Sequence, residues 1–395
     1  PLHKGTALVP LCGACKLYLG CQSPKMPLWG EGKRRILIVE EGPGADEDKQ
    51  NRPFVGKTGQ RLRRELDSLG IDLDEDCWTS NSIICRAPDN ATPTDAQISY
   101  CRPNLLRIVQ EKQPQTIILL GAPAVRSVIG YLWRENSGGI ERWQGWKIPC
   151  QKWNCWVCPT FHPSYVEREK APVLDLMFTE HLKQAFTLKK RPWKEVPDYL
   201  GKCHFVYDPR DAANFIRAVT VSGNHPIAFD YETDRLKPDD PEAKILCCSI
   251  SDGEQSLAFL WKGEAIEAMK DFLRSDVPKI CSNGKFEFRW SMSKLGIIPK
   301  NFFWDNMLAA HILDNRPNIS SIKFQAFALL GQPPWDEQVK SFMEPKGDDE
   351  KKYGDNARNQ LHKVDPKTLG IYCAMDSLME WHVARKQMKI MGVKT

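Results

Sequence analysis

The strongest constraint on the fold is an alternation of short apolar runs and amphipathic stretches in the first half of the chain. The apolar runs lie at Ile36–Glu41, Trp78–Ile84, Thr116–Gly121 and Trp156–His162. The stretches between them place leucine and isoleucine at helical spacing, as in Gly59–Leu69 and Ile98–Gln110. This alternation predicts βαβ units and a parallel sheet. We therefore expect a functional site at the carboxyl ends of the strands.

The second half begins with a similar alternation and becomes largely helical. Its expected strands lie at His204–Tyr207, Ile227–Thr233, Ile245–Ser251, Ser256–Trp261 and Lys279–Ser282. The polar residues 336–368 predict a long surface excursion before a last helix over roughly Leu369–Met391. Between the halves, residues 189–209 carry three prolines and alternating charge, which is typical of a linker. For a chain of 395 residues, the sequence predicts an α/β protein of two domains, 1–195 and 196–395.

Hydropathy and charge exclude some classes of protein and favour one kind of partner. No apolar run approaches the ~20 residues that cross a bilayer, and none follows a basic N-terminus. We therefore expect neither membrane spanning nor classical secretion. The net charge of +5 arises entirely in residues 1–200, which carry 28 Lys and Arg against 23 Asp and Glu. A basic module fits a polyanionic partner, although an ordinary solvated surface can carry the same charge.

Fourteen cysteines are too sparse for a disulfide scaffold and suggest metal or cluster ligation. Cys12 and Cys15 form a CxxC pair, and Cys85 and Cys101 lie at the ends of predicted elements. Four thiolates can bind either Zn²⁺ or a [4Fe–4S] cluster, and the spacing does not separate the two. A second group is one ligand short: Cys150, Cys155 and Cys158. Four others fit buried apolar positions better: Cys247, Cys248, Cys281 and Cys373.

Three further motifs accompany the first four cysteines. They are ILIVEEGPGADEDKQNRPFVGKTGQ at Ile36–Gln60, TSNSIICRAP at Thr79–Pro88 and TFHPSYVER at Thr160–Arg168. Together with the cysteines they resemble the iron–sulfur uracil-DNA glycosylases, family 4 of that superfamily, from about Leu11 to Ala185. The resemblance implies an α/β/α glycosylase-like domain built on a parallel sheet. It also implies a [4Fe–4S] cluster that serves structure and DNA docking, with these ligands: Cys12, Cys15, Cys85 and Cys101.

The glycosylase chemistry gives four residues a role. Cleavage of an N-glycosidic bond builds positive charge on the sugar and negative charge on the departing uracil. The resemblance assigns Glu41 to the sugar side and His162 to donation at uracil O2. Because the base must leave the stack, it also assigns Phe54 to stacking and Asn81 to pairing with the uracil edge. Singly, each residue also fits a structural role, such as a core ring or a cap.

The sequence departs from the glycosylase pattern at two places. The family usually has glycine where Glu40 stands, and this difference bears on the shape of the pocket. After His162 the family often has an apolar wedge, where this chain has Val166 and Glu167. A carboxylate at the wedge would face DNA phosphates and weaken binding.

Carboxylates mark a second site in residues 196–395. Asp230 and Glu232 end an apolar run and share one face of a strand, while Tyr372 and Asp376 share one face of a helix. SNGKFEFRW lies between them and carries Asn283 and Glu287. The three motifs resemble the DEDDy 3′→5′ exonucleases, in particular the proofreading domain of family A DNA polymerases, over about His204–Met391. The alternative is that the strand-end carboxylates are ordinary surface charges.

The exonuclease resemblance implies a ribonuclease H-like, DnaQ-like fold with a mixed sheet and two Mg²⁺ or Mn²⁺ ions. The implied ligands are Asp230, Glu232, Glu287 and Asp376, with Tyr372 orienting the attacking water. Asn283 contributes to substrate binding. The family usually has aspartate where Glu287 stands, so its carboxylate reaches one methylene further.

Together these patterns predict DNA processing at a replication fork inside a bacterial or phage-infected cell. The expected substrates are a uracil-containing strand and a primer 3′ end. We expect the chain to be the N-terminal portion of a polymerase fusion or one subunit of a split version. In the alternative reading, the first domain senses uracil or binds DNA without catalysis and positions the exonuclease. A third reading makes both domains inactive scaffolds.

Overall fold

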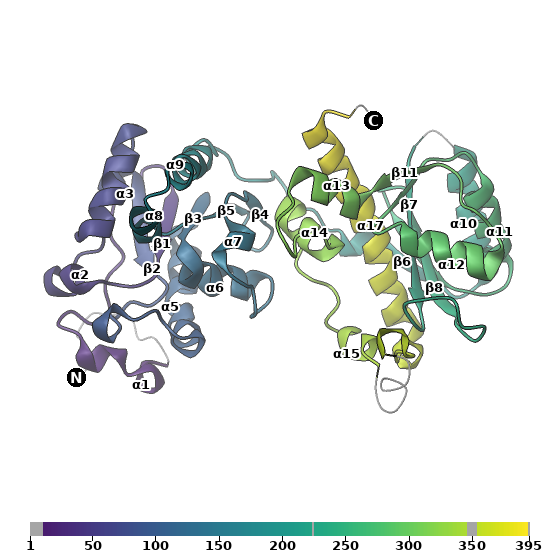
Figure 1. Cartoon of the computed structure of the whole chain (residues 1–395), viewed down its shortest axis with the longest axis horizontal. Helices are drawn as coiled ribbons and strands as arrows, with labels where there is room; N and C mark the ends of the chain where they lie inside the picture. Colours follow the sequence, from purple (N-terminus) through teal and green to yellow (C-terminus); the bar gives the residue numbers. More distant parts are fainter. Residues whose placement is uncertain (1–10, 223–224, 346–353, 394–395) are drawn as a thin grey trace. The chain divides into compact units, whose positions relative to one another are not determined.

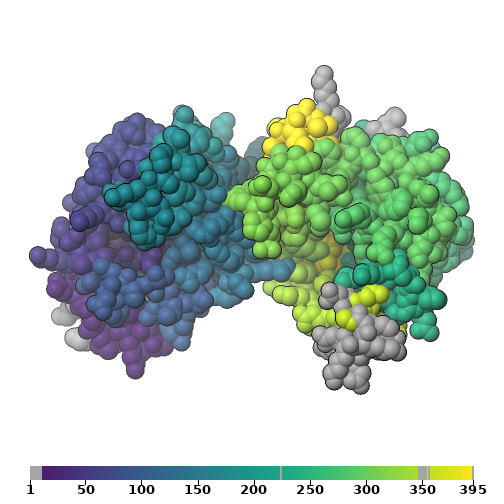
Figure 2. Space-filling model, viewed as in Figure 1, coloured from purple at the N-terminus to yellow at the C-terminus, as the bar shows by residue number. Residues whose placement is uncertain are grey.

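The computed structural model describes residues 11–222, 225–345 and 354–393, which form two compact units (Figure 1). The units are Pro1–Val196 and Pro197–Thr395. Figure 2 colours the first from purple to teal and the second from green to yellow. None of the described helices combines the length and apolar character that crossing a bilayer requires.

The first unit is built on a five-stranded sheet whose order is β2-β1-β3-β5-β4. Its strands are β1 (Ile36–Glu40), β2 (Cys77–Asn81), β3 (Thr116–Leu120), β4 (Ile148–Cys150) and β5 (Cys155–Thr160). The first four strands in this order are parallel, and β4 runs antiparallel to β5. All four apolar runs in the sequence are therefore confirmed as strands, and β4 is an addition at the edge.

Helices cover the two faces of this sheet and give three layers (Figure 1). Ile36 and Ile38 pack with α3 (Lys57–Ser68), α8 (Pro163–Glu169) and α9 (Pro172–Phe186). Residues that alternate with these point to the opposite face, where α6 (Gly121–Leu132) contacts β1 and β3 and α5 (Asp95–Lys112) packs on α6. Four short helices complete the unit: α1 (Cys12–Cys15), α2 (Ala45–Gln50), α4 (Leu73–Asp76) and α7 (Ile140–Trp143).

The second unit is built on a mixed six-stranded sheet of order β11-β10-β7-β8-β9-β6. Its strands are β6 (Cys203–Val206), β7 (Ile227–Thr233), β8 (Ile245–Ser251), β9 (Ser256–Leu260), β10 (Lys279–Cys281) and β11 (Phe302–Asp305). The meander β7–β8–β9 is antiparallel, and the other neighbours are parallel.

Two helical layers enclose the mixed sheet. On one face lie α10 (Pro209–Ser222), α11 (Glu264–Arg274) and α12 (Lys285–Leu295), and on the other α14 (Ile322–Leu330) and α17 (Pro366–Met391). Two shorter helices are α13 (Asn306–Leu313) and α15 (Lys340–Met343). The long helix α17 begins at an Asp365 cap that accepts from the Thr368 N–H and ends at Gly392 in the left-handed region. The surface excursion expected before it lies partly outside the described residues.

Candidate active sites and cysteine cluster

The four predicted ligand cysteines come together in the first unit. Cys12 and Cys15 lie on α1, Cys85 follows β2 and Cys101 lies on α5; all four line one small cavity of about 20 Å³. The backbone N–H of Lys25 donates to Cys85 Sγ at 3.3 Å, and that of Ile84 donates to Cys101 Sγ at 3.4 Å. Burial raises the pKa of both Cys85 and Cys101 to about 12, so their thiolate forms require a bound cation.

Four cysteine sulfurs around one cavity are the donor set of either a single zinc ion or an iron–sulfur cluster. In the described part of the chain, only Asp230, Glu232 and Cys373 bring three ligand atoms within 4.8 Å of one another. The other cysteine group forms no such set, although Cys150 and Cys155 are partners across β4 and β5.

The predicted glycosylase residues Glu41 and His162 line a larger pocket in the same unit. The pocket has a volume of about 390 Å³ and lies at the carboxyl end of β1. Its walls include the loop Gly42–Pro43–Gly44 and the starts of α2 and α8. Burial raises the pKa of Glu41. The strand-end location is the one that the parallel sheet predicts.

His162 is held at the pocket as the N-cap of α8. The Ser164 backbone N–H donates to His162 Nδ1 at 3.3 Å, and the Ser164 hydroxyl lies 2.6 Å from the same atom. Because a backbone N–H can only donate, Nδ1 is an acceptor and a neutral ring carries its proton on Nε2. Behind the ring, Gly121 has φ +83°, and a Cβ there would lie 3.0 Å from His162 Cβ. The cap and the glycine together fix the ring with its Nε2 donor available.

Glu40 belongs to this pocket, although the sequence presented it only as a departure from the family pattern. It ends β1, lines the pocket, and places Oε1 3.3 Å from His162 Nε2. The residue is 6% exposed, and burial raises its pKa above the usual range of a glutamate. Its register partner on β2 is Asn81. The sequence signal that could have identified Glu40 as a pocket residue is its charge, because a carboxylate at the end of a buried strand needs a polar partner.

Asn81 and Phe54 lie close to the pocket in sequence but are not among its lining residues in the described part of the chain. Asn81 is 2% exposed, and its Oδ1 has no hydrogen-bond partner among the described residues. Phe54 is 1% exposed and packs in the core cluster with α3. At the predicted wedge, Val166 is buried in that same cluster and Glu167 is exposed. The wedge position therefore presents its carboxylate and not its apolar side chain to solvent.

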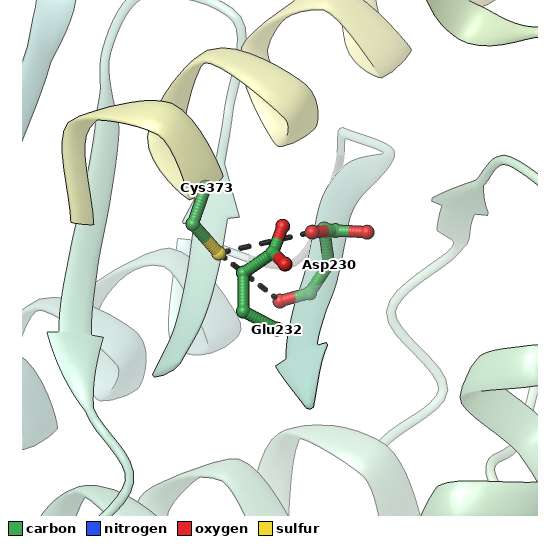
Figure 3. Close-up of side chains that lie close together, drawn as sticks. All are labelled: Asp230, Glu232 and Cys373. Atoms are coloured by element: carbon green, nitrogen blue, oxygen red, sulfur yellow. Dashed lines mark hydrogen bonds between the residues drawn. The ribbon is translucent and has the colours of Figure 1, made fainter. Parts of the chain in front are cut away.

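The second unit brings together the carboxylates that the sequence predicts for an exonuclease. Asp230 and Glu232 lie on β7, and Figure 3 shows both beside Cys373 of α17. Cys373 Sγ lies 3.7 Å from both the backbone oxygen and Oδ2 of Asp230. The predicted burial of Cys373 in an apolar cluster is confirmed, and its thiol also lies against Asp230.

The remaining predicted members come from α12 and α17. Glu287 is buried on α12 with Oε2 unpartnered among the described residues, and Tyr372 and Asp376 are buried on α17. Asn283 precedes α12 in the left-handed region, and its backbone N–H donates to Asp305 Oδ1 at 3.1 Å. This bond fixes the turn that presents Glu287 to the β7 carboxylates.

Electrostatics ties these carboxylates into one group. Burial, followed by the charge of Asp376, raises the pKa of Asp230 to about 8. Burial and then the charge of Asp230 raise the pKa of Glu232, Glu287 and Glu380. Glu380 lies one turn beyond Asp376 on α17 and was not predicted from the sequence, although the spacing i, i+4 from Asp376 was a signal.

Lys323 of α14 is the second residue of this site that the sequence did not predict. Its Nζ donates to Tyr372 Oη at 2.8 Å and to Asp376 Oδ1 at 2.5 Å. Five ionised carboxylates and one ammonium would sum to −4, which two divalent cations balance. The donor set and its charge therefore fit a pair of hard cations held by oxygen ligands.

These two sites correspond to two known families. Residues 28–188 match the family described as the uracil DNA glycosylase superfamily. A type-4 uracil-DNA glycosylase from Thermotoga maritima is 34% identical over 189 residues, which cover 46% of this chain and 92% of that protein. The chain belongs to this family. Another type-4 enzyme, from Pyrobaculum aerophilum, is 33% identical over 174 residues, 43% of this chain and 86% of that protein.

This type-4 glycosylase family member also carries a 3′→5′ exonuclease domain. Residues 203–389 match the 3′-5′ exonuclease family. A DNA polymerase of Bacillus phage SP01 is 26% identical over 363 residues, 84% of this chain but only 38% of that protein. Among solved structures, an apo nuclease overlaps weakly, at 16% identity and TM-score 0.35, over 49% of this chain and 83% of its own. The two predicted resemblances and the two-domain α/β fold class, with a parallel-rich and a mixed sheet, are confirmed.

Proposed function

We propose that residues 197–395 remove nucleotides from the 3′ end of DNA during replication, as a proofreading activity with two Mg²⁺ or Mn²⁺ ions. The single observation that carries this proposal is the group of buried carboxylates around Asp230, whose burial and mutual repulsion favour the binding of cations among them. The ions, when bound, activate water and stabilise the leaving 3′ oxygen. Water adds to phosphorus, the P–O3′ bond breaks, and a nucleoside monophosphate leaves.

The chain's own residues have separate roles in this proposal. Asp230, Glu232, Glu287 and Asp376 would hold the ions, and Glu380 adds charge behind them. The Tyr372 hydroxyl would orient the attacking water, and Asn283 would contact the substrate. A link to a polymerase, as a fused domain or as a separate subunit, is supported by the phage polymerase relative, which matches residues of both units.

The test is degradation of a labelled DNA primer that carries a 3′ mismatch, with Mn²⁺ and with EDTA. Asp230→Ala should abolish turnover, because the remaining carboxylates keep too few ligands for the ions. Tyr372→Phe should retain the ions and lose less rate. Asp271→Asn, on the exposed side of α11, is the matched control. Degradation that survives EDTA or Asp230→Ala would refute the proposal, and an RNA strand of the same sequence tests the choice of DNA.

For the first unit we propose uracil excision from single-stranded or mispaired DNA. Glu41 would stabilise the positive sugar, His162 Nε2–H would donate to uracil O2, Asn81 would pair with the base edge and Phe54 would stack. The bond between C1′ and N1 breaks, water adds to C1′, and uracil leaves with a proton on N1. The described pocket supports this through Glu41 and His162, and the unpartnered Asn81 Oδ1 supports recognition of an N–H donor.

The cofactor proposed for this unit is a [4Fe–4S] cluster on Cys12, Cys15, Cys85 and Cys101. Two measurements test the unit as a whole. An iron and sulfide assay with visible absorption should detect the cluster, and a colourless zinc protein purified without oxygen would refute it.

Alkali-sensitive breaks at uracil should disappear in Asn81→Ala and His162→Ala. Binding of uracil DNA without release of base by the wild type would favour the sensing alternative.

A further inference from the structure

Glu40 introduces a carboxylate into the pocket where the glycosylase pattern has glycine. The inference drawn from it rests on the uracil excision proposed above. The carboxyl group is not a surface charge that happens to point inward, because the whole residue is 6% exposed and ends the buried strand β1. Its Oε1 lies 3.3 Å from Nε2 of His162. Glu40 therefore lies beside the one ring atom that is available to a base.

The tautomer of His162 determines that the ring atom beside Glu40 is a hydrogen-bond donor. The Ser164 N–H donates to Nδ1, so Nε2 carries the proton of a neutral ring. The 3.3 Å approach of Glu40 lacks hydrogen-bond geometry, and Nε2 is a buried atom without a hydrogen-bond partner among the described residues. The Nε2–H donor can therefore serve either of two acceptors, the Glu40 carboxylate or a carbonyl oxygen of an entering base.

The hydrogen-bonding edge of uracil shows which of its atoms competes with Glu40 for the His162 donor. Read along the ring, the edge presents O2 as acceptor, N3–H as donor and O4 as acceptor. Asn81, the register partner of Glu40, can satisfy N3–H and O4 with its amide. His162 Nε2–H can donate to uracil O2 only if O2 displaces the Glu40 carboxylate from this donor or lies beside it without strong repulsion. An ionised Glu40 places negative charge against the O2 carbonyl, whereas a protonated Glu40 does not.

We propose that Glu40 is a specificity-determining residue of the uracil pocket, which in its ionised form engages His162 Nε2–H and repels uracil O2. Uracil is then excised through the form of the pocket in which Glu40 is protonated. Excision by this chain is therefore weakest at alkaline pH. A pocket with an uncharged residue at position 40 should not lose excision at alkaline pH in this way.

The charged groups around Glu40 set the direction of the pH dependence. His162 at the start of α8, Glu41 in the following loop and Glu47 of α2 face it, and Arg126 of α6 acts on Glu41. Burial is the largest influence and raises the pKa of Glu40, while His162 opposes it. A raised pKa means that the protonated form persists to higher pH than for an exposed glutamate. Excision should fall as pH rises through that pKa.

The experiment measures uracil release from single-stranded DNA by the full chain from acid to alkaline pH. Glu40→Gly removes the carboxylate, and Glu40→Gln keeps its volume but replaces charge with an amide that can donate to O2. Both variants should raise the excision rate at the alkaline end roughly tenfold and flatten the alkaline decline, a factor appropriate to one charge-assisted contact. Asp67→Asn, an exposed carboxylate on α3, is the charge-matched control.

The fold of each variant is checked by visible absorption of the cluster and by exonuclease rate. The wild type, Glu40→Gly and Glu40→Gln could instead excise uracil at equal rates and with the same pH dependence. That result overturns the inference about Glu40 and leaves the proposed glycosylase function standing. Excision only by the variants supports the inference and makes the native domain a uracil sensor. No excision by any folded variant overturns the inference and the proposed glycosylase function together.

Discussion

An ammonium group, that of Lys323, lies among the carboxylates of the exonuclease site. Lys323 Nζ donates to Asp376 and to the Tyr372 hydroxyl, and its charge acts on Asp230 and Glu232 as well. Its position suggests two tasks. The ammonium reduces repulsion among the carboxylates when divalent ions are absent, and it fixes the hydroxyl that would align the attacking water. Lys323 is therefore a positioning residue, because it acts through Tyr372 and Asp376.

We predict that Lys323→Met lowers the free energy of unfolding of the second unit by about 3 kcal/mol in EDTA, since breaking a buried ion pair leaves a carboxylate uncompensated. Saturating Mn²⁺ should remove most of that loss by supplying the missing charge. Thermal unfolding with and without Mn²⁺ measures both effects, and Lys323→Arg should retain stability. Lys386→Met, an exposed lysine on α17, is the matched control. An equal loss in EDTA and Mn²⁺ would show that Lys323 acts only through packing.

At the scale of elements, the long helix α17 determines the geometry of the exonuclease site. Tyr372, Asp376 and Glu380 lie on successive turns of it, and it contacts β6, β7, β8 and β9. The close approach to β6 depends on Gly370. A Cβ at that position would lie 2.1 Å from the ring of Phe205, a distance that forces one element to move.

We predict that Gly370→Ala destabilises the second unit by about 1–3 kcal/mol, the usual cost of overpacking a core. Because Tyr372 is two residues away, the displaced helix should also lower the exonuclease rate. Denaturant unfolding and the primer assay measure the two effects. Combining Gly370→Ala with Phe205→Ala should restore part of the rate by removing the ring that clashes. A single variant with wild-type stability would mean that α17 accommodates the methyl group without moving.

The elements also show what the sequence could and could not predict. The β7 and β8 bounds were predicted to the residue, because seven-residue runs that are buried along almost their whole length specify a strand locally. The edge strands β4 and β11 were not predicted. β4 has three residues, including Pro149, and β11 has four residues, none of them buried, beside β10 at the edge of the sheet. Lys323 and Glu380 were missed for a different reason: they join the site through tertiary packing and lie outside the motifs that resemble the family.

At the scale of the whole molecule, two units with separate cores hold two different sets of candidate metal ligands. The cysteine cavity lies in Pro1–Val196, and the carboxylate group lies in Pro197–Thr395. A ligand that binds only one folded unit stabilises that unit alone. Metal removal can therefore reveal whether the border near residue 196 separates two independently folding domains.

We predict two thermal unfolding transitions, each of which responds to one metal. Mn²⁺ at 100 times its dissociation constant adds about 2.7 kcal/mol to the second unit, which corresponds to roughly 5–10 °C for a domain of this size. Asp230→Ala should abolish that shift. Loss of iron, or Cys85→Ala, should lower only the other transition, because the cysteines that remain then lie in a cavity without the cation that their thiolates need. Calorimetry of wild type and both variants measures all three responses. A single transition that moves with both metals would mean that the two units unfold as one cooperative body, in which case the separate cores are not separate folding units.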